Sequence, residues 1–190
     1  MDQNFNKVFW DACANGDFPM VCSQIKAGAD VNYQNGDGRT ALMRASKRDR
    51  KDVVQVLLDN GADVNISDNK GKTALMRACL LGQDRCVEVL LDARAKINDQ
   101  DEVGRSALME ACIAFKRDTI HLLLERNADV NLFDNNGVTA LMRAAYGGYP
   151  SLVEKLLAYG ADKDMTDKQG NVALDYVREH CRAQLEPILR

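Results

Sequence analysis

Apolar positions return along the chain in short groups with helical spacing, separated by polar turns. In residues 68–100 the first group is spaced i, i+3 and i+4, which predicts one apolar face on a short helix: Leu75, Ala78 and Cys79. Thr73 precedes this helix as a predicted N-cap, and Gly82 predicts its end. A second apolar group predicts a second helix: Cys86, Val87, Leu90 and Leu91. The segment is therefore predicted as two short helices joined by a tight turn.

This pattern repeats at a fixed interval. The sequence Thr-Ala-Leu-Met-Arg-Ala occurs at 40–45, 73–78 and 139–144, and a relaxed copy occurs at 106–111. A glycine precedes each copy by two residues, with the same 33-residue step throughout: Gly38, Gly71, Gly104, Gly137 and then Gly170. Such a period is typical of a solenoid. We therefore expect a single domain over 1–190, with four full repeats between two capping repeats: 1–34, 35–67, 68–100, 101–133, 134–166 and 167–190.

The residue after the second helix also has a predicted conformation. Gly28, Gly61 and Gly160 stand at this position, where a left-handed backbone commonly ends a helix. Asn127 tolerates that conformation, whereas Arg94 is expected to be strained there. The end of the repeat 68–100 is therefore predicted to be the weakest joint.

These features together resemble the ankyrin repeat family. The resemblance rests on the 33-residue period, the motif Gly-x-Thr-x-Leu-x-x-Ala, paired leucines such as Leu57-Leu58, and Gly-Ala-Asp-Val-Asn at 28–32 and 61–65. It implies an all-α solenoid of two antiparallel helices and a hairpin turn per repeat, which serves as a binding scaffold. The family's Pro and His are replaced by Ala and Met. We expect the methionines to fill the space left by the histidine: Met43, Met76, Met109 and Met142.

Composition narrows the setting. A formal net charge of −3 predicts no general attraction to nucleic acid or to anionic membranes. No secretory signal and no apolar run of about 18 residues is visible, so we expect no membrane span and a cytoplasmic location. The six cysteines show no metal-ligand spacing and are expected to be reduced thiols.

The sequence predicts no enzymatic chemistry, cofactor or metal. Nucleophile, phosphate-loop and metal-ligand motifs are absent, and His121 and His180 have no obvious catalytic partner. The many aspartates are expected to accept hydrogen bonds from their own turns: Asp63, Asp68, Asp129, Asp134, Asp162 and Asp167. An enzyme with an unrecognised site is therefore a remote alternative. In the first capping repeat, Phe9 and Trp10 are expected to supply bulk to the core.

A binding face follows from helical geometry. Because 75, 78 and 79 face the core, positions 77, 80 and 81 and their equivalents share the other face. The resemblance places that face, with the residue after the turn glycine, in a concave groove. The predicted partner-binding residues comprise a basic margin of Arg39, Arg44, Lys47, Arg48, Lys72 and Arg77 and an apolar centre of Leu80, Leu81, Ile113 and Tyr146.

These residues favour a monomeric, non-enzymatic scaffold that binds another protein, through an acidic segment with apolar anchors. One alternative is that the arginines form only a solvated face, with Glu110 bridging Arg77 and Arg143. Another is an electrostatic binder of phosphorylated or nucleic-acid ligands, for which binding would fall steeply with salt.

Overall fold

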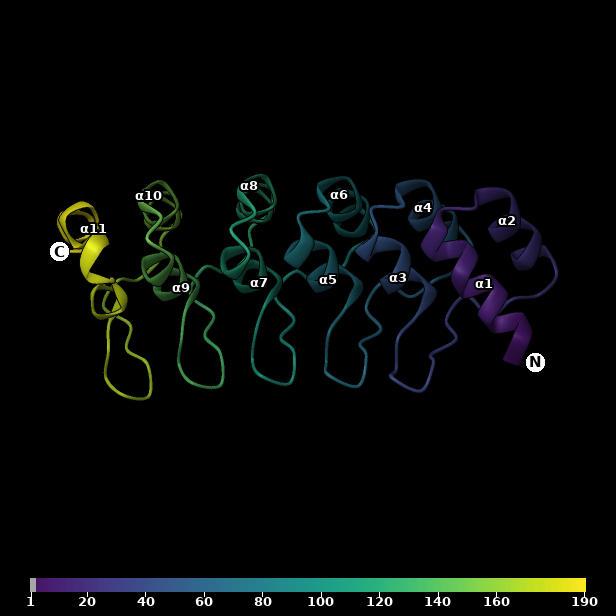
Figure 1. The fold of residues 1–190 in the computed structure, drawn as a ribbon, viewed down its shortest axis with the longest axis horizontal. Coiled ribbons are helices and arrows are strands. Elements are labelled where there is room, and N and C mark those ends of the chain that lie inside the picture. Colours follow the sequence, from purple (N-terminus) through teal and green to yellow (C-terminus); the bar gives the residue numbers. More distant parts are fainter. Residues whose placement is uncertain (1–2) are drawn as a thin grey trace. The chain divides into compact units, whose positions relative to one another are not determined.

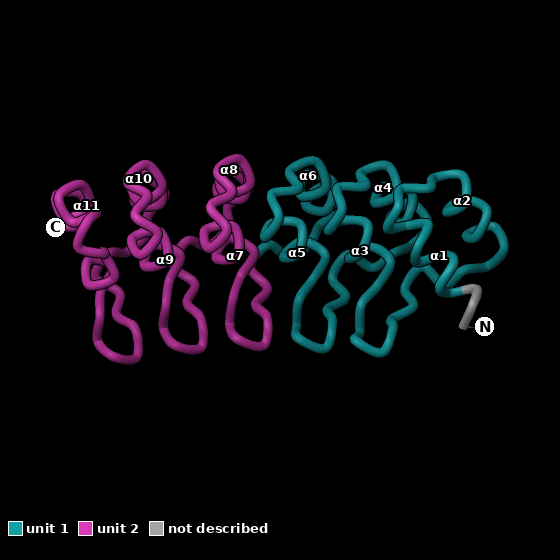
Figure 2. The backbone as a smooth tube through the Cα atoms, viewed as in Figure 1, with its two compact units in different colours: residues 1–97 teal, residues 98–190 magenta. Residues whose placement is uncertain are grey.

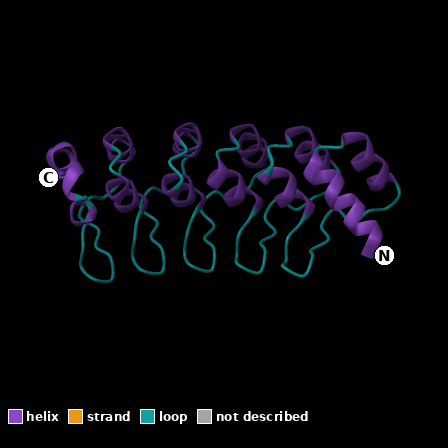
Figure 3. Cartoon of the chain, in the orientation of Figure 1, coloured by secondary structure: helices purple, strands orange, loops and turns teal. Residues whose placement is uncertain are grey.

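A computed structural model describes residues 3–190, which divide into two compact units, 3–97 and 98–190 (Figure 2). The helices of the first unit are α1 (Gln3–Asn15), α2 (Phe18–Lys26), α3 (Ala41–Lys47), α4 (Lys51–Asp59), α5 (Ala74–Leu81) and α6 (Asp84–Asp92) (Figure 1). The second unit contains α7 (Ala107–Ile113), α8 (Arg117–Glu125), α9 (Ala140–Gly147), α10 (Pro150–Ala158), the 3-10 helices η1 (Ala173–Tyr176) and η2 (Glu179–Cys181), and α11 (Arg182–Leu189). The described residues form no β-strand, which confirms the predicted all-α class (Figure 3).

Within each unit the helices form two rows. In the first unit α1, α3 and α5 lie side by side in one row, and α2, α4 and α6 form the other (Figure 1). The long loops between repeats extend from the first row away from the second (Figure 1). This arrangement leaves the outer side of the first helices and their hairpin loops on one accessible face.

The first helices begin where the sequence predicted. Thr40, Thr73, Ser106 and Thr139 each accept a hydrogen bond of 3.3 Å from the backbone N–H three residues later. That N–H belongs in every case to one of the repeated methionines, so the cap satisfies a donor that has no partner inside the helix. The four methionine side chains are buried, as expected.

The aspartates hold the hairpin loops. Oδ1 of Asp68 accepts hydrogen bonds from the backbone N–H groups of Lys70 and Lys72, at 2.9 and 3.0 Å. Asp134 and Asp167 make the same pair of bonds two and four residues downstream. Short antiparallel bridges such as Ser67 to Thr73 close the base of the loop. The predicted turn role of these carboxylates is confirmed.

Successive repeats are joined at two places besides the core. After the second helix, the Asn32 side chain donates to the carbonyl of Gly61 at 3.0 Å and accepts from the N–H of Asp63 at 2.8 Å. At the hairpin tip, the Asn69 side chain donates to the carbonyl of Gly36 at 3.0 Å, and its backbone N–H donates to Asp37 at 3.0 Å. The second unit repeats both links. At the helix end Asn131 bonds Gly160 and Asp162. At the hairpin tip Asn135 bonds Glu102 and Val103.

The left-handed positions follow the prediction. Arg94 has φ of 64° and Asn127 has φ of 61°, whereas glycine takes this conformation at 28, 61 and 160. Two further non-glycine residues adopt the left-handed conformation just after first helices: Asp49 has φ of 54° and Phe115 has φ of 52°. Arg94 is therefore held in a backbone region that costs an L-residue free energy.

The capping repeats differ in detail from the expectation. Phe9 is buried as expected, but Trp10 is only partly buried and lines a surface pocket. In the last repeat the first helix is the single 3-10 turn η1 instead of an α-helix. Here Val172 replaces the N-cap threonine, and its side chain has no oxygen to accept a hydrogen bond.

Two of the compositional expectations can be compared with the structure. None of the described helices has both the length and the apolar character needed to cross a membrane. All six cysteines are free thiols, and Cys13, Cys79, Cys86 and Cys112 are buried. Burial raises the pKa of Cys13 and Cys112 to about 12, so these thiols stay protonated.

Candidate partner-binding surfaces

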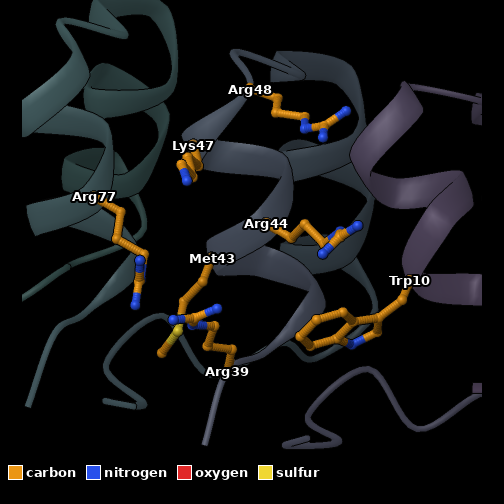
Figure 4. Close-up of a pocket in the computed structure, with 7 residues that line it drawn as sticks. All are labelled: Trp10, Arg39, Met43, Arg44, Lys47, Arg48 and Arg77. Atoms are coloured by element: carbon orange, nitrogen blue, oxygen red, sulfur yellow. The ribbon is translucent and has the colours of Figure 1, made fainter. Parts of the chain in front are cut away.

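The first unit carries a basic pocket of about 90 Å³ on the row of first helices (Figure 4). Its lining comes from α1, the hairpin before α3, α3 itself and α5: Trp10, Arg39, Met43, Arg44, Lys47, Arg48 and Arg77. Five of the predicted binding residues therefore meet in one place. A second, more open hollow of about 260 Å³ shares Trp10 and Arg44 with it and is otherwise lined by Asn6, Lys7, Asp11, Tyr33 and Asn35.

Arg44 joins the two hollows. Its guanidinium carbon lies 5.2 Å from the ring centroid of Trp10, a cation–π arrangement (Figure 4). Its Nη2 lies 3.4 Å from Oδ1 of Asp11. Trp10 and Asp11 stand 33 residues before Met43 and Arg44, so α1 offers an indole and a carboxylate where α3 has a thioether and a guanidinium. The 33-residue period could therefore have placed Trp10 on the binding face, an inference that the sequence reasoning missed.

Three arginines of the basic margin are paired with aspartates. Nη1 of Arg39 lies 3.2 Å from Oδ2 of Asp37 at the hairpin tip, and Arg44 is paired with Asp11 as described. Arg77 bonds Oδ2 of Asp68, the carboxylate that also holds the hairpin. Burial opposes the charged form of Asp68, but the Lys72 and Lys70 N–H groups and Arg77 together lower its pKa.

The same pairing recurs in the second unit. Arg143 donates to Asp134 across 2.8 Å, and the partners are again nine positions apart in the sequence. Nη1 of Arg105 lies 3.9 Å from Oε1 of Glu110. The alternative of a solvated face had Glu110 bridging Arg77 and Arg143. Each of these arginines is instead held by the aspartate of its own hairpin, which the sequence reasoning did not anticipate.

Two cations of the pocket are different. Lys47 and Arg48, at the end of α3, are exposed, and neither forms an ion pair with any side chain in the described part of the chain. Lys72 lies on the hairpin before α5 and is partly buried. The pocket therefore combines three neutralised arginines with two uncompensated charges.

The predicted apolar centre is divided between the units. Leu80 and Leu81 end α5 in the first unit, and Leu81 is 39% exposed while Leu80 is half-buried. Ile113 and Tyr146 end α7 and α9 in the second unit, with 41% and 57% exposure. Each unit thus presents exposed apolar side chains at the ends of its first helices.

The second unit also carries stacked aromatic rings and arginines that the predicted site did not include. The ring centroids of Phe115 and Tyr149 lie 3.6 Å apart in a stacked pair, and Arg117 lies 4.8 Å from the Phe115 ring. The guanidinium of Arg178 lies 5.2 Å from the ring centroid of Tyr146. Arginine and aromatic side chains are enriched at protein–protein interfaces.

Among the described residues, no cluster of three or more His, Cys, Asp or Glu side chains could hold a metal ion.

The comparison with known families covers most of the chain. A model described as ankyrin repeats (3 copies) matches residues 9–101, and one described as ankyrin repeats (many copies) matches 122–177. A model of a single ankyrin repeat matches residues 103–135. The matched stretches include the basic pocket of the first unit and the exposed aromatic side chains of the second.

Proposed function

The chain belongs to the ankyrin repeat family of all-α solenoids, whose repeats are generally protein–protein interaction modules, and on that premise we propose that it is a non-enzymatic scaffold that binds a partner protein. Partner contact is assigned to the face formed by the first helices and the hairpin loops, which is the concave face in this family. The observation that carries the proposal is the exposure of large apolar side chains at the ends of these helices, namely Leu81, Ile113 and Tyr146.

The two kinds of surface have different roles in this proposal. Apolar anchors at an interface supply most of the affinity, whereas peripheral charges chiefly affect association rate and salt sensitivity. Leu81, Ile113 and Tyr146 are the anchors, and the uncompensated Lys47 and Arg48 steer an acidic segment of the partner. The single domain expected over 1–190, with its capping repeats 1–34 and 167–190, is part of the same proposal.

Paired substitutions test the assignment of this face. A partner captured from a lysate of the source organism is titrated against the parent and two variants. Changing Leu81 and Tyr146 together to Ala should weaken binding by roughly 1–4 kcal/mol. The matched control changes Glu88 and Glu154 to Ala, on the exposed sides of α6 and α10, and should leave affinity unchanged. Loss of binding in the control, with none in the Leu81/Tyr146 variant, would place the contact on the second helices.

A second candidate function is electrostatic binding of a nucleic acid or another polyanion. It is favoured by the basic pocket alone, and the net charge of −3 opposes it. The salt dependence separates the two functions, because a polyanion releases counterions and its log K falls steeply with log salt. A shallow slope supports the protein-binding role, and a steep slope that flattens when Lys47 and Arg48 are replaced by Ala supports the polyanion role.

A further inference from the structure

The charge of the pocket in the first unit matches a doubly charged group. Five cationic side chains line it, and three of them already have an aspartate partner: Arg39, Arg44 and Arg77. The remaining two, Lys47 and Arg48, leave a surplus of two positive charges at a pocket of about 90 Å³. A carboxylate or a phosphodiester carries one negative charge, whereas a phosphomonoester carries about 1.5 to 2 at pH 7.

The pocket also has donors that lack acceptors. The Nε atoms of Arg44 and Arg77 are buried and make no hydrogen bond with any residue that the structure describes. Both arginines bond aspartates through a terminal nitrogen, and the inner N–H groups make no such bond. A buried donor without an acceptor costs free energy, so a side-chain shift that brings either N–H to an anion in the pocket would recover part of that cost.

The side chains approach the pocket from different directions. In Figure 4 Arg39 and Arg77 extend toward each other beside Met43, while Arg44 and Arg48 extend toward the side of α1 and Trp10. Arginine pairs with both carboxylate and phosphate groups, so these side chains provide anion donors on both sides of Met43. The thioether of Met43 and the indole of Trp10 supply apolar walls that limit the water around such an anion.

The adjoining hollow suits a chain attached to that anion. It continues from Trp10 and Arg44 past Tyr33 and Asn35, and its volume of about 260 Å³ exceeds that of the basic pocket. Its lining mixes aromatic rings with amide side chains, which can pack against and hydrogen-bond an extended backbone. An isolated phosphate ion would leave this hollow unused.

We propose that this pocket binds a phosphorylated side chain within an extended segment of a partner protein. The phosphoryl group lies against Lys47 and Arg48, the two cations without an aspartate partner, and the flanking residues follow the hollow past Tyr33. The inference rests on the proposed protein-binding role and adds that partner recognition depends on phosphorylation.

The probes are three degenerate peptide libraries that differ only in a fixed central residue, which is phosphoserine, aspartate or serine. The full chain is immobilised and the retained peptides are identified. We expect enrichment from the phosphoserine library alone. The best peptide is then titrated against the full chain through the fluorescence of Trp10, the only tryptophan. Converting its phosphoserine to aspartate or serine should weaken binding roughly tenfold or more, the usual size for lost charge-assisted hydrogen bonds.

Two matched variants locate the site. Changing Lys47 and Arg48 to Ala should weaken the phosphopeptide by roughly tenfold to a hundredfold. The control changes Lys70 and Lys96 to Ala, which removes the same charge from exposed positions of the same unit outside the pocket. It should change affinity by less than about twofold, because exposed charges outside the contact are largely screened. Unchanged thermal unfolding of both variants excludes a folding defect.

Several results would overturn the inference. These are equal retention of the aspartate and phosphoserine libraries, an equal loss in the control variant, or inorganic phosphate binding as tightly as the peptide. Comparable binding of single-stranded oligothymidylate would indicate the polyanion function instead. If the Leu81/Tyr146 variant loses the captured partner while no phosphopeptide binds, the pocket assignment alone fails and the scaffold role stands.

Discussion

The hydroxyl of Tyr176 donates a 2.6 Å hydrogen bond to Oδ2 of Asp167. Asp167 holds the last hairpin of the chain, and Tyr176 follows it by nine residues, the spacing that separates Asp68 from Arg77 and Asp134 from Arg143. The last repeat thus keeps the link between hairpin and first helix, although a neutral phenol replaces the guanidinium and the helix is only a 3-10 turn.

This bond predicts a measurable change in the acidity of Asp167. The Tyr176 hydroxyl is the largest cause that lowers the pKa of this carboxyl to about 2. Tyr176→Phe should therefore raise the pKa of Asp167 toward the ordinary value of about 3.9, as followed by NMR titration of the side-chain carboxyl. The remaining donors, the N–H groups of Gln169 and Asn171 and the Asn171 amide, should keep it below that value.

The sign of the stability effect follows from the lowered pKa. A carboxyl whose folded-state pKa lies below its unfolded value stabilises the fold above about pH 4, and this contribution is lost as pH falls toward 2. Tyr176→Phe should shift the acid unfolding midpoint of the second unit to higher pH. An unchanged carboxyl titration in the variant would show that the hydroxyl does not set the acidity.

Arg94→Gly should stabilise the first unit. Arg94 has φ of 64° at the position where Gly28 and Gly61 take the same conformation without a Cβ. Relief of left-handed strain contributes roughly 1–2 kcal/mol, and the greater freedom of unfolded glycine offsets about half, so the net gain is about 1 kcal/mol in urea denaturation.

Gly61→Ala is the matched control for Arg94→Gly. A Cβ at Gly61 would meet no atom within 4 Å, so any loss there reports backbone strain alone. It should destabilise the unit by about 1 kcal/mol. If Arg94→Gly lowers stability while Gly61→Ala has no effect, the left-handed position is not strained.

Leu90→Ala should destabilise the first unit much more than Leu91→Ala. Leu90 is fully buried in α6, whereas its neighbour Leu91 is partly exposed. Truncating a buried leucine leaves a cavity and costs roughly 2–5 kcal/mol, measurable by urea denaturation. Equal losses for the two substitutions would contradict the orientation of α6.

The thiols should separate into two classes. Cys22 and Cys181 are partly exposed, and the other four are buried. For Cys86, burial, followed by the nearby Asp49 carboxylate, raises the pKa to about 12. Brief treatment of the native protein with N-ethylmaleimide, read by peptide mass spectrometry, should label only Cys22 and Cys181. Treatment in denaturant should label all six, and rapid native labelling of Cys13 or Cys112 would contradict the predicted packing.

Local features of the fold could be predicted because they depend on neighbouring residues alone. Thr73 caps its helix and Asp68 binds its own loop through contacts within four residues, and both signals recur in phase. Arg94 could be identified as strained because the period places it at a glycine position. Repetition made each of these predictions stronger, since the same residue type returned at the same place.

The candidate sites were less predictable because they depend on side-chain conformation between repeats. The nine-residue spacing of Asp68 and Arg77 is visible in the sequence, but whether the guanidinium turns to its hairpin or to solvent is decided by packing. Trp10 lies in a capping repeat that lacks the Thr and Gly landmarks, so its place over Arg44 became clear only from the structure. The short first helix of the last repeat, η1, likewise depends on the missing cap at Val172.

The two asparagine links between successive repeats limit how the length of this chain can change. One added residue in α4 would carry Gly61 and Asp63 away from Asn32, and one added at a hairpin tip would separate Asn69 from Gly36. Duplication or loss of a whole 33-residue repeat instead supplies each asparagine with an equivalent partner. Such a protein therefore lengthens or shortens most readily by complete repeats, which accounts for a period that shows no slippage from Gly38 to Gly170.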